Sequence, residues 1–292
     1  MTHIEESKRL PIVAIAMPSL QQGKFLGAAL HSLFRQEGID LKVAVMDAGS
    51  SDESQTVIAN YDNKITFWRS YPDNGQAAAI NEGINCLGEA DYVGWLNVDD
   101  LILPDGLRKM VRFLEENQEC CAVFGKAEII DESAKKTGEY PTQSFDAKTF
   151  ARSCSICQPA SLIRKRAWEQ VGGVDESLHM CMDYDLWWKL SKMGRMGYLQ
   201  EFVACSRDHG ATKTRTNIGQ HLKEGIHLVR KYYGRVPINW YINCAAYDKN
   251  PQIKGYTFLD KVKFRIIAIR CYLTDVFQTR NDEGGDGKEA KN

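Results

Sequence analysis

Two adjacent carboxylates, Asp99 and Asp100, follow an apolar run from Tyr92 to Val98. Such a run is typical of a strand that is buried on both faces of a parallel sheet, and sheets of this kind bind ligands at the carboxyl ends of their strands. Two carboxylates there repel each other unless a cation intervenes, which suggests a hard divalent ion with oxygen ligands. Side chains alternate along a strand, so this pair can converge only if the chain turns. A solvated loop is the commoner explanation of such a pair taken alone.

Further polar residues are expected at the same edge of the sheet. Ser19 follows a strand predicted at 11–17, and Asp47 ends one predicted at 41–46. The turn at Gly49 would let the base or ribose of a nucleotide approach the backbone, and Asp47 could accept a hydrogen bond from a ring N–H. Asp47 could equally do no more than organise its own turn before the next helix.

Two downstream positions could carry acid–base or metal chemistry. Asp183 opens a helix predicted at 183–193, where it could cap the helix and also serve as a base, because the helix dipole keeps a carboxylate ionised there. Asp185 must point to a different side of that helix. His209 follows the last predicted strand, at 197–205, and a neutral imidazole there could ligate a metal or contact a diphosphate. A lone histidine is more often structural.

These side chains require a particular arrangement of strands and helices. The first hundred residues alternate strand and helix four times, which predicts an α/β fold with a doubly wound, mostly parallel sheet. The predicted strands are 11–17, 41–46, 65–68, 92–98, 121–130, 158–163 and 197–205. The predicted helices are 24–36, 52–61, 76–86, 105–116, 165–171, 183–193 and 217–233, with a hairpin or loop at 131–144.

The overall composition narrows the function classes. A net charge of −1 over 292 residues provides no basic field that would attract nucleic acid. Residues 1–10 have no apolar h-region, and no window holds 18 uncharged apolar residues, so neither a signal peptide nor a membrane span is expected. Nine scattered cysteines fit reduced thiols. We therefore expect a cytoplasmic protein.

A helix predicted at 259–278 is both basic and amphipathic. Its apolar stripe comprises Val262, Ile266, Ile269, Leu273 and Val276, and the cations Lys261, Lys263, Arg265 and Arg270 lie off it. Such a helix can lie on an anionic membrane, so peripheral contact with the inner face of the membrane is one possibility. Docking of the stripe on the protein is commoner, and it is the expectation favoured here. The polar, Gly-rich residues after Arg280 are expected to be disordered.

Taken together, the motifs from about Pro11 to Thr214 resemble the family 2 glycosyltransferases, which have the GT-A fold. The order and spacing of the segments carry the resemblance, more than any single motif does. They are Pro18-Ser19, Asp47-Ala-Gly-Ser-Ser-Asp52, Pro72-Asp-Asn-Gly-Gln76, Ala79-Ile-Asn-Glu-Gly83, Trp95-Leu-Asn-Val-Asp99-Asp100, Gln158-Pro159 and Asp183-Tyr-Asp-Leu-Trp187.

The resemblance implies a GT-A type, mostly parallel mixed sheet flanked by helices, with a C-terminal helical extension. It divides the chain into an arm (1–10), a glycosyltransferase domain (11–215), a helical extension (216–280) and a tail (281–292). Within the domain, 11–104 would bind the nucleotide sugar and 105–215 the acceptor.

It also implies an inverting, metal-assisted transfer from a nucleotide-diphospho-sugar, expected to be a UDP-sugar, to a hydroxyl of a glycan or glycolipid. Asp183 matches the catalytic base, and Asp100, Asp99 and His209 would hold Mn²⁺ or Mg²⁺, with Asp100 the direct ligand. The donor would be bound by Pro18, Ser19, Asp47, Gly75, Gln76, Asn97 and Asp99.

The chain departs from the family pattern at two positions. Asn97 stands where the family often has an acid, and Ala48 stands where it commonly has a second acid, which affects base recognition. The Gln-x-x-Arg-Trp motif of processive synthases is absent, so transfer of a single sugar is expected.

Two alternatives remain open. A nucleotidyltransferase would need a Gly-rich, basic loop after the first strand, but residues 19–24 contain one Gly and one Lys. A non-catalytic binding module would not need Asp99, Asp100 and Asp183 together.

Overall fold

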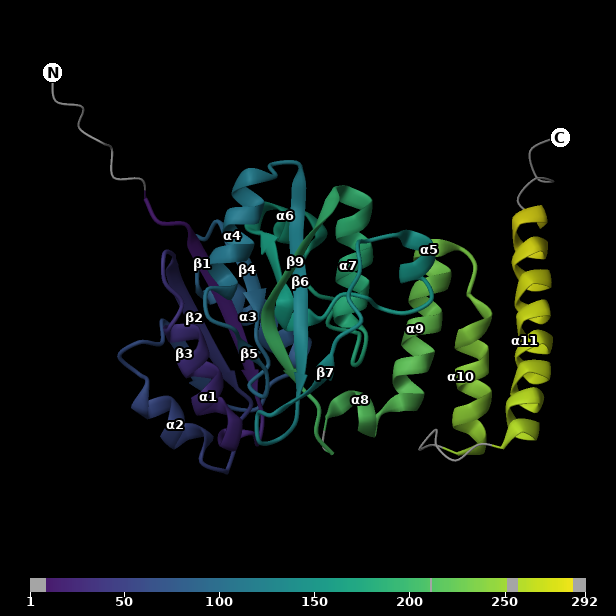
Figure 1. Cartoon of the computed structure of the whole chain (residues 1–292), viewed down its shortest axis with the longest axis horizontal. Helices are drawn as coiled ribbons and strands as arrows, with labels where there is room; N and C mark the ends of the chain where they lie inside the picture. Colours follow the sequence, from purple (N-terminus) through teal and green to yellow (C-terminus); the bar gives the residue numbers. More distant parts are fainter. Residues whose placement is uncertain (1–8, 211, 251–256, 286–292) are drawn as a thin grey trace, which may run out of the picture. The chain divides into compact units, whose positions relative to one another are not determined.

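The computed structural model describes residues 9–210, 212–250 and 257–285 (Figure 1). The chain divides into two compact units. The sheet unit comprises 1–145 and 155–212, and the helical unit comprises 146–154 and 213–292. The division falls close to the predicted boundary at 215. The segment 146–154 was expected in the glycosyltransferase domain and instead belongs to the helical unit.

The sheet unit is built on a mixed, nine-stranded sheet within the described residues. Its strands are β1 (Ile12–Ser19), β2 (Asp40–Asp47), β3 (Phe67–Ser70), β4 (Tyr92–Trp95), β5 (Leu101–Ile102), β6 (Cys120–Ile130), β7 (Lys136–Glu139), β8 (Ser161–Arg164) and β9 (Arg195–Arg207). Their order is β3-β2-β1-β4-β8-β6-β9-β5, and β7 pairs with β6 in a hairpin. The predicted α/β fold with a mixed sheet is confirmed.

The first four strands are mutually parallel, in the order β3-β2-β1-β4. Strand β8 then runs antiparallel to both β4 and β6, whereas β9 runs parallel to β6. Because β1 lies in the middle of the parallel group, all its residues are buried, as its unbroken apolar sequence requires. The carboxyl ends of β1, β2 and β4 therefore meet at one edge of the sheet.

The helices of the sheet unit connect these strands. They are α1 (Gly23–Phe34), α2 (Ser54–Asn60), α3 (Gln76–Cys86), α4 (Gly106–Glu116), the 3₁₀ helix η1 (Gln158–Ala160), α6 (Lys165–Val171) and α7 (Met182–Met193). Residues 158–160 were expected to be strand, but only 161–164 pair with the sheet. In α1, Leu26, Leu30 and Leu33 recur at helical spacing and are fully buried in the main core.

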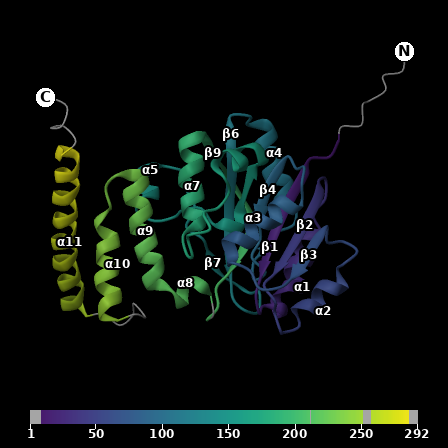
Figure 2. The ribbon, with the colours of Figure 1, turned by 180° about the vertical axis from the view of Figure 1, so that it is seen from behind.

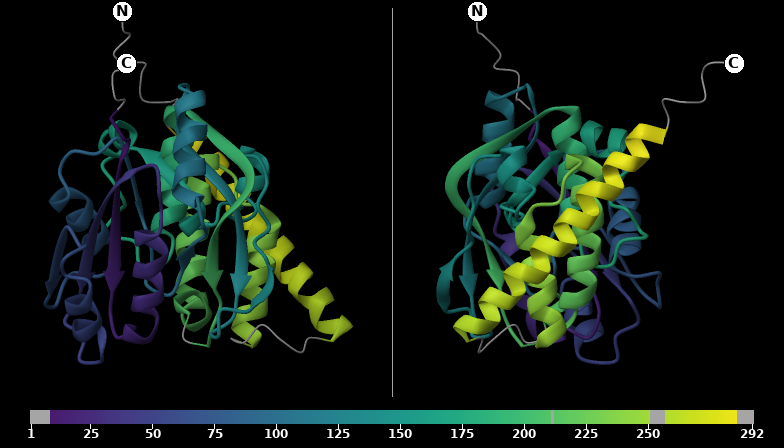
Figure 3. Two further views of the ribbon diagram at one scale, coloured as in Figure 1. Left: turned by 60° about the vertical axis from the view of Figure 1, so that its left-hand side comes forward. Right: turned by 90° about the vertical axis from the view of Figure 1, so that its right-hand side faces the viewer.

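The helical unit contains α5 (Ala147–Phe150), α8 (Lys213–Thr216), α9 (Ile218–Tyr233), α10 (Ile238–Lys249) and α11 (Phe258–Gly285) (Figure 2). The indole N–H of Trp240 on α10 donates to the carbonyl of Ala151 at 2.9 Å, which ties 146–154 to this unit. Helix α11 crosses its neighbours obliquely (Figure 3). None of the described residues forms a helix long and apolar enough to cross a membrane.

Two expectations for the C-terminal region are wrong. The predicted stripe does not dock, because Val262, Ile266, Ile269 and Leu273 are exposed and the helix packs through Phe264 and Ala268 instead. The side chain of Val276 lies outside the described residues. Helix α11 also continues to Gly285, beyond the expected start of the disordered tail at 281. Residues 286–292 lie outside the described residues.

Candidate functional site

Asp99 and Asp100 lie in a tight turn beyond β4. The strand ends at Trp95, earlier than the predicted 98, and the N–H of Asp100 donates to the carbonyl of Asn97 at 3.0 Å. This i to i+3 hydrogen bond closes a turn. The turn that the adjacent carboxylates required is therefore present.

Arg207, at the end of β9, holds this turn in place. Its backbone N–H donates to Asp100 Oδ1 at 2.9 Å, and its Nε donates to the carbonyl of Asp99 at 2.7 Å. The same guanidinium also donates through Nη1 to the carbonyls of Asp131 at 2.7 Å and Glu132 at 3.0 Å. Burial, and then the charge of Asp99, raise the pKa of Asp100. Asp100 is thus a buried anchor between the turn and β9.

Asp99 faces a different partner. Its Oδ2 lies 3.2 Å from Nε2 of His209, which is 110 residues further along the chain. His209 is itself buried, and its ring packs against Phe25 with a centroid distance of 5.2 Å. The structure therefore brings together the carboxylate and the imidazole that the sequence placed at the same edge.

Asn97 is held between two other amides. Gln76 Nε2 donates to Asn97 Oδ1 at 2.8 Å, and Asn97 Nδ2 lies 3.4 Å from Gln158 Oε1. Gln158 Nε2 in turn donates to the carbonyl of Trp95 at 2.7 Å. An amide at position 97 suits these neighbours because it both donates and accepts. Gln158 entered the sequence argument only through the resemblance, yet it connects η1 to the end of β4.

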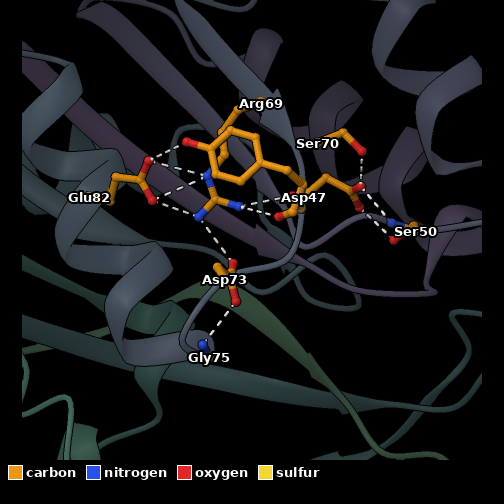
Figure 4. Close-up of polar contacts among 8 residues, drawn as sticks. Asp47, Ser50, Arg69, Ser70, Asp73, Gly75 and Glu82 are labelled. Atoms are coloured by element: carbon orange, nitrogen blue, oxygen red, sulfur yellow. Dashed lines mark hydrogen bonds and ion pairs between the residues drawn. The ribbon is translucent and has the colours of Figure 1, made fainter.

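Asp47 is fully buried at the end of β2 (Figure 4). Its Oδ2 accepts the N–H of Ser50 at 2.9 Å and the hydroxyl of Ser70 at 2.6 Å, and its Oδ1 accepts the hydroxyl of Ser50 at 2.6 Å. The turn-organising role is confirmed. A carboxylate offers about four acceptor positions, so one position on Oδ1 is left for a nucleotide base, and that contact remains a prediction.

Arg69 on β3 was not singled out in the sequence, although it is the central cation of this cluster (Figure 4). The buried guanidinium donates to the carbonyl of Asp47 at 2.9 Å, to Asp73 at 3.1 Å and to Glu82 at 2.6 Å. Asp73 accepts the N–H of Gly75 at 2.9 Å. In the sequence, the only sign of this role was that Arg69 directly follows a short predicted strand.

The first turn of α3 is therefore set by Arg69 through Asp73. Gly75 adopts a φ of 103°, which favours glycine, and a Cβ added there would meet no atom within 4 Å. Gln76, the first helical residue, points its amide to Asn97 as described above. Both residues were predicted to contact the donor, and the open space beside Gly75 is compatible with that.

Pro18 and Ser19 form the end of β1, directly beside β2. Both are buried, and Ser19 Oγ has no hydrogen-bond partner among the described residues. A buried hydroxyl without a partner costs free energy, on the order of 1–3 kcal/mol. This hydroxyl lies beside the Asp47 cluster, and a ligand could hydrogen-bond to it without displacing a protein contact.

Asp183 is positioned by α7. Cys181 is the N-cap, so Asp183 lies in the first turn instead of capping the helix, and its Oδ1 accepts the N–H of Tyr184 at 2.8 Å. Trp187, one turn later on the same face, stacks on Trp95 with a centroid distance of 6.1 Å. Asp183 therefore lies on the face of α7 that meets the end of β4. Asp185 differs, being fully buried and paired with Lys189 at 2.7 Å.

The side chains around the turn of Asp99 and Asp100 fit a divalent cation that is also bound by a substrate. Within the described residues, no group of three or more His, Cys, Asp or Glu side chains is arranged to hold a metal. Asp99 and His209 supply two adjacent donors, and Mg²⁺ is commonly bound by one or two protein ligands together with substrate phosphates and water. Both carboxylate oxygens of Asp100 already lie near protein donors, Arg207 N at 2.9 Å and Asn97 Nδ2 at 3.4 Å.

Comparison with known proteins defines the class. A family model described as Glycosyl transferase family 2 matches residues 14–172, more than half of the chain. The chain belongs to this family, and the resemblance identified from its motifs is confirmed.

Individual relatives of this chain have low sequence identity to it. An uncharacterized glycosyltransferase of Rickettsia typhi is 27% identical over 72% of this chain and 68% of its own length. The hyaluronan synthase of Pasteurella multocida is 24% identical over 87% of this chain, which spans only 26% of that synthase.

Solved structures show the same GT-A type fold. S. aureus TarS (residues 1–349), in complex with UDP-GlcNAc, matches with a TM-score of 0.65 and 14% identity over 91% of this chain and 82% of its own. A mannosyltransferase of Pyrobaculum calidifontis, in complex with GDP-Man and Mn²⁺, matches with a TM-score of 0.59 and 14% identity over 94% of this chain and 84% of its own.

Proposed function

We propose that this protein is an inverting glycosyltransferase that moves a single sugar from a nucleotide-diphospho-sugar, a UDP-sugar in the first instance, to a hydroxyl of a glycan or glycolipid. Family membership supports the reaction type. Structural neighbours that bind UDP-GlcNAc or GDP-Man support a nucleotide-sugar donor. Nine free cysteines fit a reducing, cytoplasmic setting.

One observation carries the proposal: the pairing of Asp99 with His209 at the carboxyl end of a parallel β-α region. Ligands of open α/β sheets bind at that edge. The two residues are 110 positions apart in the sequence, and Oδ2 of Asp99 lies 3.2 Å from Nε2 of His209. If the turn at Asp99 served only to end β4, Asp99 would not need His209 as a partner. We assign them as the protein ligands of Mn²⁺ or Mg²⁺, with Asp100 supporting the turn, which revises the expectation that Asp100 is the direct ligand.

The remaining residues bind and orient the substrates. Ser19 Oγ and the free position on Asp47 Oδ1 would receive the nucleoside, and Asn97, between Gln76 and Gln158, would present a fixed amide to the donor. When bound, a divalent cation offsets the charge that develops on the departing diphosphate by several kcal/mol.

Asp183 would act as the general base. The first turn of a helix stabilises its ionised form. As the acceptor oxygen attacks the anomeric carbon from the face opposite the diphosphate, the hydroxyl proton moves to the Asp183 carboxylate. Acid–base help of this kind contributes about 10²–10⁴-fold to the rate.

The test measures transfer and hydrolysis of UDP-, GDP- and dTDP-sugars by the pure protein, with and without Mn²⁺. Asp183→Asn should keep nucleotide affinity, measured by calorimetry, and should lose turnover. Undiminished turnover in this variant would refute the base assignment. Release of pyrophosphate from a nucleoside triphosphate and a sugar phosphate would instead identify a nucleotidyltransferase, and binding of sugar nucleotides with no turnover would identify a binding module.

A further inference from the structure

Helix α11 carries an apolar face that the helical unit leaves uncovered. At about 100° per residue, Phe264 and Ala268 lie on one side of the helix, and both are buried, at 4% and 0% exposed. The opposite side carries large apolar side chains that are 37–78% exposed. They are Phe258 (78%), Leu259 (69%), Val262 (37%), Ile266 (62%), Ile269 (47%) and Leu273 (46%).

The packed side of α11 is anchored independently of this face. Phe264 packs with Ala245 and Ala246 of α10. Asp260 accepts hydrogen bonds from the N–H and hydroxyl of Thr257 at 3.0 and 2.8 Å, and the Thr257 hydroxyl accepts from the N–H of Asp260, which forms a capping box. The helix is therefore held on α10 with its apolar stripe turned outward.

Cations flank the apolar stripe on both sides. By the same helical geometry, Lys261 and Arg265 border one side of the stripe and Lys263 and Arg270 border the other, and all four are exposed. The one acid among the described side chains of α11, Asp260, is buried and pairs with Lys249. Over the part of α11 whose side chains the structure describes, 258–274, the exposed surface is thus apolar along its centre and positive along both edges.

We infer that this face of α11 binds an anionic lipid bilayer, with the helix lying in the plane of the membrane surface. Apolar side chains enter the boundary between headgroups and acyl chains, while lysine and arginine stems reach the lipid phosphates. None of the described helices can span a membrane, so an in-plane arrangement is the one that fits. A second copy of the chain fits the face poorly, because two such helices would place cationic edges against each other. This inference does not depend on the proposed activity.

The experiment is flotation of the full-length protein with vesicles of phosphatidylcholine alone or of phosphatidylcholine mixed with phosphatidylglycerol. The protein should float with the anionic vesicles, and the bound fraction should fall as salt is raised, because the exposed cations are screened. Failure to float with anionic vesicles at low salt would overturn the inference, as would equal binding to neutral vesicles.

Variants that remove charges test whether α11, and not another part of the protein surface, binds the membrane. Each cation near an anionic membrane strengthens binding by about 1 kcal/mol, so Lys263→Gln with Arg270→Gln should weaken partitioning on the order of thirtyfold. The matched control is Lys192→Gln with Lys223→Gln, which removes two exposed charges elsewhere and should change partitioning less than about twofold. Equal losses in both pairs would refute a site on α11.

Apolar variants test the stripe itself. Ile266→Ser with Leu273→Ser should lower partitioning at least about tenfold, because two half-exposed side chains no longer enter the bilayer. The control Ile267→Ser removes a 49% exposed side chain that lies off the stripe and should bind nearly as well as wild type. Unchanged circular dichroism shows that the variants remain folded. A concentration-dependent dimer that the stripe variant abolishes would show that a second copy covers the face, and would overturn the inference.

Discussion

Two acidic clusters occupy the same edge of the sheet unit and are built differently. In the closed cluster, Ser50 and Ser70 fill three of the roughly four acceptor positions of Asp47. The guanidinium of Arg69 pairs with Asp73 and Glu82. The other cluster, Asp99, Asp100 and His209, is called the open cluster here. Its nearest guanidinium, that of Arg207, gives its hydrogen bonds to carbonyl oxygens.

This difference indicates which cluster has a structural role and which one can take part in the reaction. A buried carboxylate such as Asp47, whose acceptor positions are mostly filled by protein donors, stabilises a loop and has at most one position left for a ligand. Adjacent carboxylates that no guanidinium neutralises repel each other, and burial raises the pKa of Asp100 further. We therefore propose that the open cluster binds the divalent cation, whereas the closed cluster fixes the loop from Tyr71 to Gly75 beside it.

The sharpest test of the contrast is Asp99→Asn. It should lower kcat/KM about a thousandfold, because several kcal/mol of transition-state stabilisation depend on the cation. The melting temperature should stay unchanged or rise slightly, because the repulsion with Asp100 is relieved. Calorimetric titration of UDP with and without Mn²⁺ is the direct readout. The control is Asp40→Asn, an exposed acid at the opposite end of β2. Retained Mn²⁺-dependent binding in Asp99→Asn would place the metal elsewhere.

The largest effect on stability is expected from Arg69→Met. The guanidinium is buried and bonds to two carboxylates and two carbonyls, so its removal leaves charges without their partner, at a cost of about 3–5 kcal/mol. Denaturant unfolding measures the loss. Arg35→Met, at an exposed position, should change the free energy of unfolding by less than about 0.5 kcal/mol. A small loss at Arg69 would mean that the closed cluster does not hold the fold.

The sequence predicted the open cluster better than the closed one, for a physical reason. Apolar periodicity identifies strands and helices, and α3 and α6 begin and end where the pattern indicated. Asp99 and His209 could be placed together because parallel strands share an edge. The roles of Arg69 and Arg207 could not be predicted from the sequence, since they depend on hydrogen bonds to residues 13 and 108 positions away. For α11 the sequence left both docking and an outward face open, and the favoured docking was wrong, because an apolar stripe has the same pattern whether it is covered or exposed.

Asp47→Asn tests whether the closed cluster is structural. The amide keeps the shape but turns an N–H₂ toward a hydroxyl or N–H donor, so the free energy of unfolding should fall by about 1–3 kcal/mol. The kcat of the folded fraction should change less than about tenfold, in contrast to Asp99→Asn. A thousandfold loss of kcat with unchanged stability would show that Asp47 belongs to the catalytic machinery.

The smallest expected effect is a pH dependence carried by Glu82. Hydrogen bonding to Arg69, and then the charge of that guanidinium, hold the pKa of Glu82 below its ordinary value of 4.5 in spite of partial burial. A carboxyl whose pKa is lower in the folded state stabilises the fold above the unfolded pKa, and loses that contribution as the pH falls through the folded value. The side chain is 38% exposed, so screening keeps the effect below about 1 kcal/mol. Urea unfolding at pH 7 and at successively lower pH should therefore show a gap between wild type and Glu82→Gln that closes on acidification. A gap that widened instead would contradict the ion pair as a source of stability in the closed cluster.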